Sequence, residues 1–119
     1  MIRTGIFTRV VGYTARGAVN KCAPDGSLIA EFQLGVGGGS KKYPAMWVVV
    51  AVWAELAEQV LVAIDKPGIA VEAVGILRVG MFEGQRGRAV AIDLRDVREI
   101  RIYNRDVDLV KELLRKPGE

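Results

Sequence analysis

Residues 46–64 read MWVVVAVWAELAEQVLVAI and contain the strongest structural signals of the chain. The first part, residues 46–53, is apolar on both faces of an extended chain, which is typical of a strand within a packed β structure. Because successive side chains of a strand point to opposite faces, Trp47 and Trp53 must project from the same face. We therefore expect a strand over 46–53 whose two tryptophans lie on one side.

The second part of this stretch has the spacing of a helix. Leu56, Val60 and Ile64 recur at steps of four, which places them on one face of a helix. The sequence DKPG follows at 65–68, and its proline and glycine end a helix. A short amphipathic helix is therefore predicted over 54–64, directly after the strand.

Further strands are expected on both sides of this helix. Apolar and polar residues alternate over 28–36, which is the period of a half-buried strand. Two more strands are expected over 69–82 and 89–102, joined by a glycine- and arginine-containing turn at 83–88. Two to three strands before the helix and two after it give the order of an OB-fold, so the sequence predicts an all-β fold, a five-stranded OB-fold barrel with one helix between its third and fourth strands.

The composition argues against most catalytic chemistry. The chain has 119 residues, enough for one domain, and no histidine, the commonest general base and metal ligand. Its single cysteine, Cys22, has no disulfide partner within the chain, and we interpret it as a small, half-buried thiol without a role. We therefore expect no enzyme, no metal, no cofactor and no small-molecule substrate.

Charge and hydropathy permit a nucleic-acid partner without identifying one. The chain has 17 Lys and Arg against 14 Asp and Glu, a formal net charge of +3. Over 95–101 arginines alternate with acidic residues, which predicts salt-bridged contacts rather than a phosphate track. No apolar run reaches the roughly 18 residues of a membrane span, and no secretory signal is recognisable at the start, so we expect a cytoplasmic protein without a membrane partner.

Several segments resemble one known family. The VG pair at 11–12, the PDG turn at 24–26 and the alternating segment 28–34 are similar to the opening of the bacterial single-stranded-DNA-binding protein family. The block WVVVAVWAELAE at 47–58 resembles the aliphatic strand and helix start of that family, and it is the most specific match. Segment 67–78 resembles the family's strand after the helix.

The resemblance covers about residues 5 to 103. It implies an OB-fold domain over 1–103 that forms a homo-oligomer, a tetramer or a dimer. Such a protein coats single-stranded DNA without strong sequence preference in replication, recombination or repair. The modest charge leaves an alternative function from a different class. In this alternative the chain is an OB-fold protein-interaction module whose aromatic face docks a protein. A primosome accessory or an assembly subunit would be an example.

The resemblance also assigns the candidate site. It implies that Trp47 is the principal stacking residue, with Trp53 and Phe82 at other aromatic positions of the family. Stacking on aromatic faces and phosphate neutralisation by basic residues are the two usual means of holding a single strand. The candidate basic residues are Arg78, Arg86, Arg88, Lys41 and Lys42, with Arg3 and Arg9 as weaker candidates and Tyr43 in place of a loop aromatic of the family. The structural alternatives are core packing for the aromatic residues and simple solvation for the basic loops.

The last part of the chain departs from the family pattern, which ends in a flexible tail with an acidic, aromatic-ended tip. Over 104–119, apolar residues recur instead at helical spacing: Val107, Val110, Leu113 and Leu114. We expect a C-terminal helix over 104–119 that packs on the barrel or on a neighbouring subunit. Recruitment of partners through an acidic tip is not expected.

Overall fold

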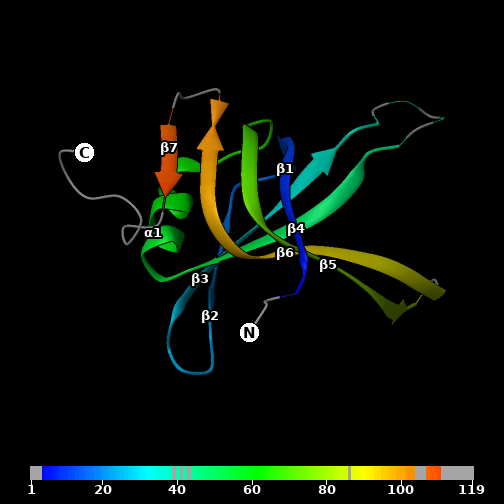
Figure 1. Cartoon of the computed structure of the whole chain (residues 1–119), viewed down its shortest axis with the longest axis horizontal. Coiled ribbons are helices and arrows are strands. Elements are labelled where there is room, and N and C mark those ends of the chain that lie inside the picture. Colours follow the sequence, from blue (N-terminus) through cyan, green and yellow to red (C-terminus); the bar gives the residue numbers. More distant parts are fainter. Residues whose placement is uncertain are drawn as a thin grey trace.

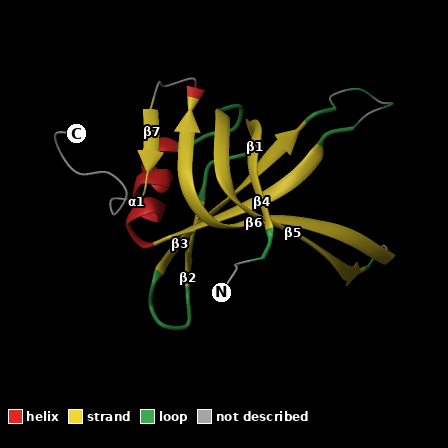
Figure 2. Cartoon of the chain, viewed as in Figure 1, coloured by secondary structure: helices red, strands yellow, loops and turns green. Residues whose placement is uncertain are grey.

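The computed structural model describes residues 4–38, 40, 42, 44–85, 87–103 and 107–110. Its elements, in chain order, are β1 (Ile6–Thr14), β2 (Val19–Cys22), β3 (Leu28–Val36), β4 (Met46–Trp53), α1 (Ala54–Ala63), β5 (Ala70–Gly84), β6 (Gly87–Ile102) and β7 (Val107–Val110). Figures 1 and 2 show these strands wrapped around one another, with α1 at one end. The strands and the helix expected up to residue 102 are all present.

Five of the strands close into a ring. β1 pairs with β5, β5 with β6, β6 with β4, β4 with β3, and β3 pairs back with β1. All of these pairs are antiparallel except β4 with β6, which is parallel. A closed ring of five strands with one helix between β4 and β5 confirms the predicted OB-fold. The short strand β2 adds to the free side of β3 and lies outside the ring.

The ring closes through a tight approach of β1 to β3. A Cβ atom on Gly12 would lie 2.4 Å from the backbone oxygen of Gly35, so this position requires glycine. The buried hydroxyl of Thr14 donates a hydrogen bond to the Lys66 carbonyl (2.9 Å) and accepts one from the Ile69 N–H (3.0 Å). These contacts join the end of β1 both to β3 and to the turn that precedes β5.

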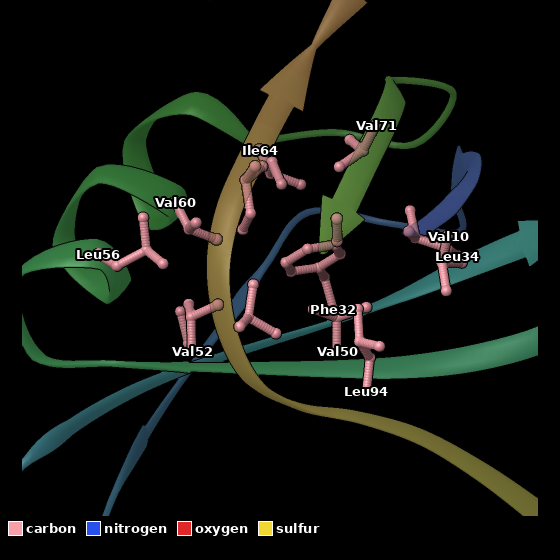
Figure 3. Packing of buried hydrophobic residues seen from close by; sticks show 14 of the residues in the cluster. Val10, Phe32, Leu34, Val50, Val52, Leu56, Val60, Ile64, Val71 and Leu94 are labelled. Atoms are coloured by element: carbon pink, nitrogen blue, oxygen red, sulfur yellow. The ribbon is translucent and has the colours of Figure 1, made fainter. Parts of the chain in front are cut away.

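The core fills the inside of the ring and continues under α1 (Figure 3). Phe32, Val50 and Leu94 contribute to it from three different strands of the ring, and Leu56 and Val60 contribute from α1. The strand and helix periods in the sequence therefore identified the buried faces correctly. No helix in the described part of the chain has the length and apolar character needed to cross a membrane.

The β5–β6 hairpin bends sharply on its way out of the barrel. The register shifts between Val74 and Ile76, which marks a β-bulge, and Asp96 opposite it has a positive φ of 49°. A Cβ on Gly75 would lie 2.6 Å from the Arg95 carbonyl oxygen, so glycine permits this close contact. Beyond the bulge the hairpin extends away from the barrel, and Figure 1 shows it diverging from the β3–β4 hairpin on the same side of the view.

The predicted C-terminal helix is wrong at residues 107–110, which form strand β7 antiparallel to β6. β6 pairs with β4 only over 92–94, so its residues 99–102 would otherwise present unpaired N–H and C=O groups at an open edge. β7 pairs with that segment, and this backbone pairing outweighs the helical spacing of the apolar residues. The other residues of the predicted helix, 104–106 and 111–119, lie outside the described residues.

Cys22 also differs from the expectation, because it is exposed rather than half-buried. It is the last residue of β2, a strand that covers only the edge of β3. Its thiol makes a long contact with the carbonyl oxygen of Ala23 at 3.5 Å. The position at a sheet edge explains the exposure.

Candidate nucleic-acid interface

The two tryptophans lie on the outer face of β4. Side chains at 48, 50 and 52 are buried in the core, so the alternate positions face outward. Trp47 is 52% exposed and Trp53 is 51% exposed. The predicted common face is confirmed, and neither tryptophan serves as core packing.

Trp47 extends across the neighbouring strand at Gly35, its direct partner in the β3–β4 register. A Cβ on Gly35 would lie 3.0 Å and 3.1 Å from the indole atoms Cζ3 and Cη2. The six-membered ring therefore rests on the glycine backbone, which fixes the orientation of the side chain while leaving much of it exposed. The sequence alone does not single out Gly35, because its role depends on the strand register.

A groove of about 300 Å³ lies beside Trp53 on the same outer face. Its walls come from β2, β3, β4 and β6. Ile29, the register partner of Trp53, lines it together with Val49 and Ala51 of β4. The surface between the two tryptophans is therefore continuous and largely apolar along β4.

Charged residues of the same groove are mostly paired with one another. Lys21 lies 2.9 Å from Glu31, and Arg95 lies 3.6 Å from Asp93. Two basic and three acidic residues line the groove, the third acid being Asp96. This part of the surface is thus suited to stacking or to apolar contacts, and it contributes little positive potential.

Three of the five main basic candidates lie on described segments. Arg78 is exposed on β5 opposite Asp93 in the β5–β6 register. Arg88, near the tip of the same hairpin, lies 3.3 Å from Glu83. Lys42 is exposed in the segment that joins β3 to β4. Asp93 pairs in turn with Val49 of β4, so Arg78 shares the outer face of the tryptophans, two strands from Val49. Arg88 and Lys42 lie instead on the projecting parts of the two hairpins.

The other predicted residues are placed only in part. Phe82 lies in β5 opposite Ala89, and its side chain is outside the described part of the structure. The following candidates lie outside the described residues altogether: Arg3, Lys41, Tyr43 and Arg86. Arg9 is on β1, where it lies 3.5 Å from Glu72 and away from the tryptophans.

Comparison with known proteins supports the fold. No protein-family model matches the sequence, and no curated protein matches it either. Among solved structures, the chain is similar to the crystal structure of a small single-stranded DNA-binding protein from Streptomyces coelicolor. The two are 17% identical, the match covers 82% of this chain and 94% of that chain, and the TM-score is 0.64. At this identity the likeness establishes a shared barrel architecture.

The arrangement can bind by stacking more readily than by charge. Two half-exposed indoles lie six residues apart on one strand, which corresponds to roughly 20 Å at the usual strand rise. Among the described residues, no group of three or more acidic, cysteine or histidine side chains is placed to hold a metal ion. The described surface thus offers aromatic faces, an apolar floor and dispersed cations.

Proposed function

We propose that this protein binds and coats single-stranded DNA without strong sequence preference. The observation that carries the proposal is the pair of half-exposed tryptophans, Trp47 and Trp53, on one outer face of an OB barrel. Every base has an aromatic face, so stacking on such residues holds a strand whatever its sequence. The similar fold of a protein described as single-stranded DNA-binding supports the same conclusion.

In this proposal the basic residues act on phosphates at the flanks of the aromatic path. Arg78 and Lys42 are exposed on the two hairpins that leave the barrel. Arg88 can also contribute, because its ion pair with Glu83 is solvent-exposed, and exposed pairs are weak enough to exchange partners. Phe82, Arg86, Lys41 and Tyr43 complete the proposed interface on the strength of the sequence resemblance.

We further propose that the protein is a cytoplasmic, non-enzymatic homo-oligomer, a dimer or a tetramer, that acts in replication, recombination or repair. The projecting part of the β5–β6 hairpin supports self-association, because Val79, Met81 and Val90 are all exposed there. Apolar residues gathered on one protruding element usually mark an interaction surface. Sedimentation equilibrium tests this: Met81→Ser is expected to shift the assembly toward smaller species, and a wild-type monomer would contradict it.

A second candidate function is docking of a protein on the aromatic face. The paired charges of the groove beside Trp53 favour it, because a phosphate backbone gains little from cations that already have acidic partners. The two candidates differ in their salt dependence. DNA binding weakens with added salt through counterion release, whereas a largely apolar protein interface does not.

The deciding experiment is titration of intrinsic tryptophan fluorescence with oligothymidine at low and high salt. The wild-type protein is expected to be quenched, and the quenching should weaken as salt is added. Trp47→Ala should lose most of the quenching and about 1–3 kcal/mol of binding free energy, the usual contribution of one stacked base. A wild-type protein that shows no quenching at low salt would refute DNA binding and favour protein docking.

A further inference from the structure

Tyr13 is an exposed aromatic residue at the ring closure to which neither the sequence analysis nor the proposed interface gives a role. It is 62% exposed, whereas its neighbours Gly12 and Thr14 are buried. The alternation along β1 therefore directs the tyrosine to the outside of the barrel. The side chain is not part of the core, so a ligand can reach its ring.

The strand register places Tyr13 and Trp47 on either side of one glycine. Tyr13 pairs with Gly35 across β1–β3, and Gly35 pairs with Trp47 across β3–β4. Directly paired residues of neighbouring strands project from the same face of a sheet. Tyr13 and Trp47 therefore share the outer face, with only the backbone of Gly35 between them.

The spacing is short enough for both rings to form one surface. Neighbouring strands lie about 4.8 Å apart, so the two backbones are roughly 10 Å apart. The indole bridges part of that distance, because it lies over Gly35 on the side chain's path toward β1. A side chain at position 35 would occupy the space above the β3 backbone where the Trp47 ring lies. Glycine keeps that space open for the aromatic rings.

The end of β1 is held firmly in this place. The Ala15 N–H donates a hydrogen bond to the Gln33 carbonyl (3.1 Å), just beyond the Tyr13–Gly35 pair. Thr14 fixes the same segment to the turn before β5 through its side chain and its backbone. A rigid support lowers the entropy lost when a ligand orders the residues that it contacts.

We propose that Tyr13 and Trp47 form a two-ring stacking platform that carries a bound single strand from β4 across β3 onto β1. This rests on the proposed function, and it adds a binding residue to it. Arg16 is exposed and follows Tyr13 by three residues in the chain, and in this proposal it provides a cation for a phosphate near the end of β1. The bound path then runs over three strands instead of following β4 alone.

The test compares the affinity for oligothymidine of wild type, Tyr13→Ala, Tyr13→Phe and Phe7→Ala by fluorescence quenching of the two native tryptophans. Phe7 is the matched control, because it is an exposed aromatic residue on the same strand but pairs with Ile76 of β5, away from Trp47. We expect Tyr13→Ala to weaken binding by at least about fivefold, the lower bound for one stacked base, and Tyr13→Phe and Phe7→Ala to bind like wild type.

Each outcome separates this proposal from the function on which it rests. If wild type is quenched and Tyr13→Ala binds equally well, the platform is wrong while DNA binding stands. If wild type is not quenched at all, both the platform and the proposed DNA binding fail.

A second experiment, which does not depend on the folding of a variant, crosslinks the wild-type protein to an oligonucleotide that contains 5-iodouracil and identifies the modified residues by mass spectrometry. Modification of Tyr13 is expected, and crosslinks confined to other residues would overturn the proposal.

Discussion

Replacing Gly12 with alanine should destabilise the protein by pushing β1 away from β3. The added Cβ would lie 2.4 Å from the Gly35 carbonyl oxygen and 3.2 Å from Cγ2 of Val36. The first neighbour is backbone and cannot rotate away, so the strands must separate. Overpacking of this kind typically costs about 1–3 kcal/mol. For a chain of this length, that loss lowers the melting temperature by about 3–15 °C.

Thermal unfolding followed by far-ultraviolet circular dichroism measures the effect, at one protein concentration because association would shift the midpoint. Gly80→Ala is the matched control, since nothing lies within 4 Å of its added Cβ. It should leave stability unchanged or raise it by up to about 1 kcal/mol, because alanine restricts the unfolded chain. If Gly12→Ala melts at the same temperature as Gly80→Ala, the tight ring closure is refuted.

Three further perturbations test the core, the closure and the outer face. Leu94→Ala removes a fully buried side chain and should cost about 2–5 kcal/mol in urea unfolding, so a smaller loss would mean a looser core. Thr14→Val keeps the shape but leaves the buried N–H of Ile69 without its acceptor, which should cost about 1–3 kcal/mol by the same assay. The hydrogen bond to Glu72 raises the pKa of Tyr103. That bond stabilises the fold below the ordinary tyrosine pKa and is lost as pH rises through the raised pKa. An absorbance titration at 295 nm should therefore show one late-titrating tyrosine that Glu72→Ala moves to lower pH.

Local periodicity was sufficient to predict the strands and the helix of the barrel, and their order along the chain together with the family resemblance predicted the fold. The alternation over β3 and the apolar run of β4 identify which side chains face inward, and the steps of four identify the buried face of α1. These signals are local, because each depends only on neighbours along the chain. The common outward face of Trp47 and Trp53 followed from the same period, and the structure confirms it.

What the sequence could not predict depends on pairing between distant segments. Gly35 and Tyr13 gain their importance only because the register aligns both with Trp47. Strand β7 was mistaken for a helix because Val107 and Val110 fit helical spacing, while the open edge of β6 that attracts it is visible only in the folded sheet. Neither the register nor an unpaired edge is encoded in a single local pattern.

The distribution of charge bears on how the proposed interface would hold DNA. The groove beside Trp53 contains more acidic than basic residues, and its cations Lys21 and Arg95 have acidic partners within 4 Å. Phosphates would therefore gain little attraction inside the groove. Arg78 lies on the neighbouring strand opposite the groove residue Asp93, and Arg88 and Lys42 lie on the projecting parts of the two hairpins. Each contacted phosphate on a single strand contributes a slope of about −0.7 to the salt dependence of binding. With few such contacts, affinity must come mainly from base stacking. This need for stacking supports the proposed platform of Tyr13 and Trp47 beside Gly35, because a second ring adds aromatic area on which a base can stack.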